Sequence, residues 1–135
     1  MRIYRRELIY WCLLLIHDLA MLGPPMTSDL LSVCRPSKKA AANEASKDLL
    51  ESLISIRRLR DPFLSRLLAE TLGFFCSDER IHGRLLKAGI VDAVLSYMDT
   101  STSAAPIDPD LLLWAVASLL NLAMTSKVSS DDAGP

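Results

Sequence analysis

The chain carries the same apolar segment near both of its ends. Residues 8–21 align with residues 111–124 without a gap, and identical residues stand at five of the fourteen positions. Asp18 falls opposite Asn121, and most of the remaining pairs are apolar on both sides. An internal repeat constrains the fold more than any single residue does, because it predicts stacked units and not one closed globule.

A weaker copy lies between the first two. Residues 69–76 match residues 117–124 in pattern, with Gly73 at the position of Asn121. The equivalent positions Asp18, Gly73 and Asn121 are therefore 55 and 48 residues apart. These spacings are somewhat longer than the roughly 40–47 residues of helical repeat units, and insertions between helices would account for the excess. Chance similarity between leucine-rich helices is the alternative explanation.

Composition indicates a single all-α domain. Half of the 135 residues are hydrophobic, only 6% are aromatic, and Leu and Ala dominate over β-branched residues. Such a composition favours helix over strand, and a chain of this length forms one domain at most. The 15 basic residues nearly balance the 16 acidic ones, so the chain as a whole attracts neither nucleic acid nor an anionic membrane.

Proline and glycine mark the ends of the expected helices. A helix over residues 5–22 that is apolar nearly all round ends at a Gly-Pro-Pro sequence, where a helix cannot continue. A short helix over residues 28–33 and a long amphipathic run over residues 38–60 follow. Asp61 and Asp108 are each followed by Pro, which predicts two helix starts, because Asp caps a helix and Pro suits its first turn.

The segment 80–98 resembles the first two helices of an armadillo repeat. In that family a short helix ends in a (Lys/Glu)-Ala-Gly turn, and here the turn is Lys87-Ala88-Gly89. Gly89 suits such a reversal because glycine takes positive φ without strain. The third helix of an armadillo repeat ends in Leu-x-Asn-Leu-Ala, and residues 119–123 carry that sequence.

The resemblance implies a short right-handed α-solenoid of about two repeats plus one leading helix, over residues 1–125. Residues 77–125 are the best-matching repeat and residues 28–76 a degenerate one. Residues 5–22 then correspond to the third helix of an incomplete repeat, and residues 126–135 to a disordered tail. A repeat cut at its last helix predicts a fragment or short isoform of a longer protein, or a chain that forms homo-oligomers through its uncapped ends.

The resemblance also implies a non-catalytic function. In armadillo proteins the third helices line a concave groove that binds an extended peptide, and the Asn position hydrogen-bonds the peptide backbone. We therefore expect a protein-binding scaffold or adaptor with no enzyme activity, cofactor, metal or small-molecule substrate. The groove candidates, from which Trp and Arg would anchor the partner, are Trp11, Asp18, Arg66, Glu70, Trp114 and Asn121. The structural alternative is that such Trp and Asn side chains are core residues.

Candidate catalytic and metal-binding residues are sparse. Cys12, Cys34 and Cys76 lack any metal-ligand or disulfide pattern, which indicates a reduced cytoplasmic protein, with nuclear or cytoskeletal association as further options. His17 stands beside Asp18. Because neighbouring residues point about 100° apart on a helix, we expect this pair to interact poorly.

Two other functions stay open. The arginines within residues 2–6, followed by an apolar run, are typical of a targeting segment over residues 1–22 of a secreted or membrane-anchored helical protein. The recurrence of the same pattern at residues 111–124 argues against this interpretation. Arginines within residues 57–66 would match phosphates, but no interleaved aromatic residues support binding of nucleic acid.

Overall fold

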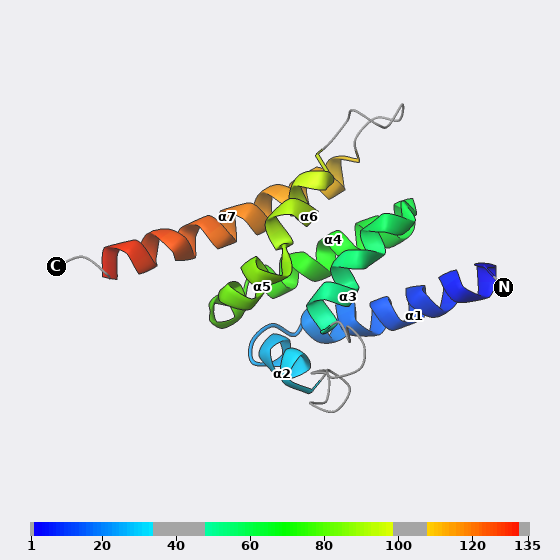
Figure 1. Ribbon diagram of the computed structural model, residues 1–135, viewed down its shortest axis with the longest axis horizontal. Coiled ribbons are helices and arrows are strands. Elements are labelled where there is room, and N and C mark those ends of the chain that lie inside the picture. Colours follow the sequence, from blue (N-terminus) through cyan, green and yellow to red (C-terminus); the bar gives the residue numbers. More distant parts are fainter. Residues whose placement is uncertain (1, 34–47, 99–107, 133–135) are drawn as a thin grey trace.

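The computed structural model describes residues 2–33, 48–98 and 108–132. Within these ranges the chain forms seven packed α-helices, two short 3₁₀ helices and no strand, so the predicted all-α class is confirmed (Figure 1). The first part of the long amphipathic run predicted over residues 38–60 lies outside the described residues. None of the helices in the described part is both long and apolar enough to cross a membrane.

The helices follow one another in a regular order along the chain. The α-helices are α1 (Arg2–Ala20), α2 (Met26–Val33), α3 (Leu49–Ser55), α4 (Pro62–Cys76), α5 (His82–Ala88), α6 (Ile90–Ser96) and α7 (Pro109–Asp132). The 3₁₀ helices are η2 (Ile56–Leu59) and η3 (Glu79–Ile81). The three longest elements, α1, α4 and α7, correspond to the three copies of the sequence repeat.

The predicted helix starts and turns are confirmed. The carboxylate of Asp61 caps α4 by accepting hydrogen bonds from the backbone amides of Phe63 and Leu64, at 3.0 and 3.2 Å. Asp108 accepts a 3.0 Å hydrogen bond from the amide of Asp110 at the start of α7. Gly89 takes a φ of 89° between α5 and α6, a conformation that glycine adopts at little cost.

Helices α1 and α2 begin two or three residues earlier than predicted, and α1 ends two residues earlier. The largest difference from the sequence prediction lies at the end of α7. Helix α7 continues to Asp132, so residues 126–132, which were expected to belong to a disordered tail, are helical. No Gly or Pro interrupts the chain between Asp110 and Asp132, and the helix therefore meets no residue that would end it.

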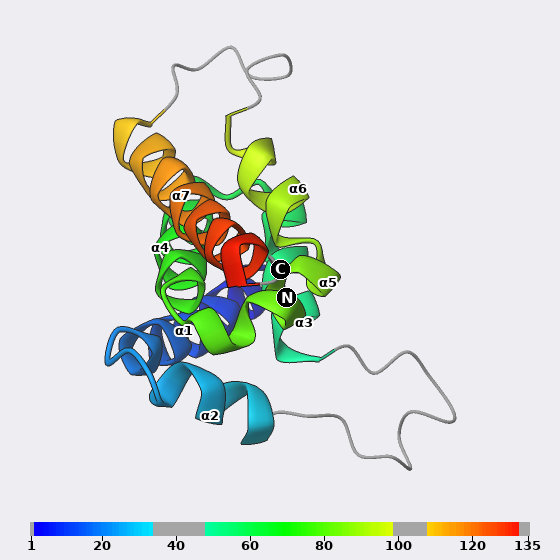
Figure 2. The same ribbon diagram turned by 90° about the vertical axis from the view of Figure 1, so that its left-hand side faces the viewer.

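Helix α4 lies in the middle of a row of three. It packs against α1 on one side and α7 on the other, and the three helices run in the same direction across Figure 1. The shorter helices α3, α5 and α6 lie on one side of this row (Figure 2). Helix α4 accordingly contributes much of the core, including the fully buried side chains of Leu68, Leu72 and Phe75.

A buried carboxylate joins α2 to the end of α4. The side chain of Asp78 is only 2% exposed and accepts hydrogen bonds from the hydroxyls of Thr27 and Ser28, at 2.7 and 2.6 Å. It also caps η3 through the amide of Arg80, at 3.1 Å. The sequence does not predict this link, because it joins residues 50 and 51 positions apart in the chain.

Candidate protein-interaction surface

The solvent-facing side of α4 carries aromatic and charged side chains. Phe63 is 73% exposed, the side chain of Arg66 is half-exposed, and that of Glu70 is partly exposed. These residues are spaced three and four apart and therefore share one side of the helix. The opposite side of α4 is buried in the core. The structure thus places Arg66 and Glu70, both predicted groove residues, on the same accessible surface.

Helix α1 meets this surface through His17. The Nδ1 atom of His17 lies 3.0 Å from Oδ1 of Asp18, and Nε2 lies 3.0 Å from Oε2 of Glu70. The expected poor pairing of His17 with Asp18 is therefore wrong, because side-chain torsions bring the two groups together although their Cβ atoms diverge. A neutral imidazole donates to one of these carboxylates, whereas the imidazolium donates to both.

Helix α7 meets α4 through Trp114. The indole ring lies edge-on to the ring of Phe74, with centroids 5.3 Å apart, and it covers Gly73. A Cβ atom on Gly73 would lie 2.5 Å from Cε3 of Trp114, which is closer than real Cβ contacts allow. Phe74 also contacts the ring of His17, with centroids 5.3 Å apart. A line of three rings, His17, Phe74 and Trp114, therefore crosses all three helices.

Two ion pairs connect the same helices. Arg6 of α1 pairs with Asp61 at the start of α4, and Arg66 of α4 pairs with Asp110 at the start of α7. The hydrogen bond from Arg6 lowers the pKa of Asp61, and the backbone amides that Asp61 caps act in the same direction. Because both arginines and Asp110 are about half-exposed, solvent screens the two pairs and they add little to stability.

The remaining groove candidates are Asn121 and Trp11. Asn121 follows Trp114 by two helical turns on the same side of α7 and is partly buried. Trp11 is exposed and contacts Tyr10 edge-on, with centroids 5.4 Å apart. It lies about 120° around α1 from His17 and about 140° from Arg6, the two residues that pair with α4. The structure therefore does not bring Trp11 to the other candidates.

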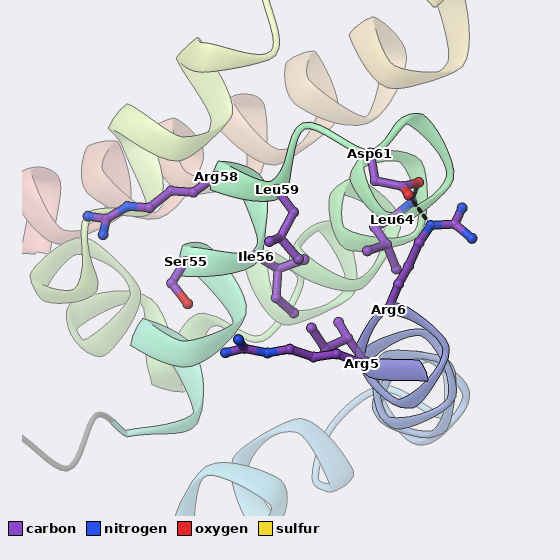
Figure 3. Close-up of a pocket in the computed structure, with 9 residues that line it drawn as sticks. Arg5, Arg6, Ser55, Ile56, Arg58, Leu59, Asp61 and Leu64 are labelled. Atoms are coloured by element: carbon purple, nitrogen blue, oxygen red, sulfur yellow. Dashed lines mark hydrogen bonds and ion pairs between the residues drawn. The ribbon is translucent and has the colours of Figure 1, made fainter. Parts of the chain in front are cut away.

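A cavity of about 620 Å³ opens beside α1 and the η2–α4 turn (Figure 3). Its lining residues are Arg5, Arg6, Ile9, Ser55, Ile56, Arg58, Leu59, Asp61 and Leu64. The carboxylate of Asp61 is occupied by Arg6, and within the described ranges no carboxylate pairs with Arg5 or Arg58. The cavity therefore combines apolar walls with unpaired positive charge, and none of the predicted groove residues lines it.

Neither a metal-binding cluster among the described residues nor a related protein points to a function. Among the residues that it describes, no group of three or more His, Cys, Asp or Glu side chains is placed to hold a metal ion. Comparisons with protein-family models, with curated proteins and with solved structures find no significant match. A functional interpretation therefore depends on the geometry of the α1–α4–α7 surface itself.

Proposed function

We propose that this chain is a non-catalytic protein-interaction module of armadillo-like architecture, which binds an extended segment of another protein across α1, α4 and α7. One observation carries the proposal. The three helices lie in a row and run in the same direction, and α4 in the middle leaves Phe63, Arg66 and Glu70 accessible on one side. Such a surface offers an aromatic contact and charges of both signs within two helical turns.

The charges on this surface indicate the chemistry of the partner. The cluster of Asp18, His17 and Glu70 holds two carboxylates around one imidazole, so it favours a basic side chain. Among the described residues, Arg66 pairs with Asp110 through a half-exposed contact, which a carboxylate of the partner displaces at little cost. Phe63 supplies apolar area. The partner is therefore a peptide segment with an apolar residue and an acidic residue near one end and a basic residue toward the other.

A peptide library displayed on phage and selected against the purified chain tests this function. We expect the selected peptides to shift backbone amide resonances of α4 and the adjoining sides of α1 and α7. Phe63→Ala and Glu70→Gln should each weaken binding about tenfold or more, because truncated anchors commonly cost over 1 kcal/mol. Leu86→Ala serves as the control, since Leu86 is an exposed leucine on α5.

Two results would contradict the proposal. Peptides that bind but map to another surface would remove the α1–α4–α7 row from consideration. Unchanged affinity of both variants, with the control also unchanged, would show that Phe63 and Glu70 contribute nothing to recognition.

A further inference from the structure

The outer side of α1 is an uncovered apolar surface. Leu8, Trp11 and Leu15 are between 57% and 63% exposed, and their spacings of three and four place them on one side of the helix. Leu15 lies about 180° around the helix from Arg6 and about 160° from His17. Since Arg6 and His17 pair with α4, these three residues, the α1 end face, point away from the rest of the molecule.

Helix α7 has a matching uncovered surface at the other end of the row. Leu113, Val116, Leu120 and Met124 are between 51% and 66% exposed and are spaced three, four and four apart, so they share one side of the helix. Val116 lies about 160° around the helix from Trp114, the residue that packs on Gly73 of α4. These four residues form the α7 end face, which like the α1 end face contains no charge.

The repeat relates the α1 end face to a contact inside the molecule. In the gapless alignment of the two segments, Trp11 is equivalent to Trp114 and Leu15 to Ser118. Both α7 residues lie against Gly73 of α4. The side that α1 exposes is therefore equivalent to the side of α7 that packs against α4, its neighbour in the row.

The α7 end face shows the converse relation. In the same alignment Val116 is equivalent to Leu13 and Leu120 to His17. Leu13 is buried, and His17 contacts Glu70 of α4. The side that α7 exposes is therefore equivalent to the side of α1 that packs against α4. Each chain thus carries both halves of one helix–helix contact, and each half is unused.

We propose that α7 of one copy packs in the same direction against α1 of a second copy, so that the chains associate head to tail. A second copy fits better than an unrelated protein because it carries both faces. Its α1 end face can meet the α7 end face of the first copy, and its α7 end face remains for a third. The contact is heterologous and does not close on itself, so the assembly grows with protein concentration. It is independent of the proposed peptide-binding function, which uses Phe63, Arg66 and Glu70.

Analytical ultracentrifugation with two variants tests this geometry. Leu15→Arg blocks the α1 end face and Leu120→Arg blocks the α7 end face, so each variant alone should sediment as a monomer. A mixture of the two should form a one-to-one dimer and nothing larger, because one intact face of each kind remains. Wild type should show an average mass that rises over about a hundredfold concentration range. The matched control Leu86→Arg, at an exposed α5 position, should behave as wild type.

The wild-type chain offers a second measurement that needs no substitution. Trp11 is exposed in the single chain whereas Trp114 already packs against Gly73 and Phe74. Association should therefore move tryptophan emission to shorter wavelength as concentration rises. A wild-type monomer at every concentration, an unshifted emission, or a variant mixture that stays monomeric would each overturn the proposal. Dimers that only one of the two variants disrupts would instead show a symmetric contact and would overturn it equally.

Discussion

The hydroxyl of Tyr97 is buried after α6 with no hydrogen-bond partner among the described residues. Burial also raises the pKa of this phenol. Because an unsatisfied buried hydroxyl costs free energy, we expect Tyr97→Phe to raise the free energy of unfolding by about 0.5–2 kcal/mol. Urea denaturation followed by circular dichroism measures the change. A loss of stability in this variant would show that the hydroxyl is paired in solution.

Asp78 makes stability depend on pH. Burial acts to raise the pKa of this carboxyl, but hydrogen bonds from Ser28, Thr27 and Arg80 outweigh it and leave the pKa lowered. The unfolded chain, with an Asp pKa of about 3.9, therefore binds a proton before the folded chain does. This contribution to stability is complete above about pH 5 and is lost as the pH falls through the folded pKa.

Replacing Asp78 by Asn should reveal this contribution. We expect Asp78→Asn to lower the free energy of unfolding at pH 7 by about 1–3 kcal/mol, because charge-assisted hydrogen bonds to buried partners are lost. The decline of stability between about pH 5 and pH 3 should also become shallower. Asp29→Asn, at an exposed position in α2, is the control. An equal acid sensitivity of Asp78→Asn and wild type would exclude Asp78 as the source.

The thiol of Cys76 is protected in the folded chain. Its side chain is fully buried, and burial raises its pKa to about 12, although the hydroxyl of Ser118 acts in the opposite direction. Cys12, by contrast, is exposed. Because the thiolate is the reactive species, we expect iodoacetamide at neutral pH to modify Cys12 readily and Cys76 only after unfolding. Peptide mass spectrometry with and without denaturant distinguishes the two. Rapid labelling of Cys76 without denaturant would contradict the burial.

At the scale of elements, the contact between α4 and α7 depends on the absence of a side chain at position 73. Ala is a better helix former than Gly by about 1 kcal/mol, so Gly73→Ala would stabilise an isolated helix. In the folded chain its Cβ would lie 2.5 Å from the ring of Trp114, and overpacking typically costs about 1–3 kcal/mol. We therefore expect a net loss of stability, measured by thermal denaturation.

A second substitution separates the clash from other effects. Trp114→Leu removes the ring that meets position 73, so Gly73→Ala should be neutral or stabilising in that background. The non-additivity of the two changes in a double-mutant cycle then reports their coupling. Additive effects would show that the ring of Trp114 does not rest on Gly73.

Local sequence signals predicted the elements well, and the contacts between elements poorly. The caps at Asp61 and Asp108 and the turn at Gly89 depend on residues within one helical turn, so the sequence alone identifies them. The pairing of His17 with Glu70 and the packing of Trp114 on Gly73 join different helices. Their geometry is set by how far one helix is displaced along another, which the repeat pattern does not specify.

At the scale of the whole molecule, the candidate surface was predicted in part. The sequence pattern selected Asp18, Arg66 and Glu70. Asp18 and Glu70 flank His17 where α1 meets α4, and Arg66 pairs with Asp110 where α4 meets α7. It did not predict that Phe63 would be exposed, because a phenylalanine next to a helix start is as readily explained by the core. It also treated Trp11 and Trp114 alike, although one is at an uncovered end and the other inside a contact.

The central place of α4 has a consequence for how water reaches the backbone. Helix α4 has neighbours on two sides, whereas α1 and α7 each lie at an end of the row. In dilute protein, amide hydrogens of α1 and α7 should exchange with deuterium through local fraying, and those of α4 only through global unfolding. Native-state hydrogen exchange measures this order, and equal protection in all three helices would refute it. Of the three helices, α4 should therefore be the last whose amides exchange with solvent.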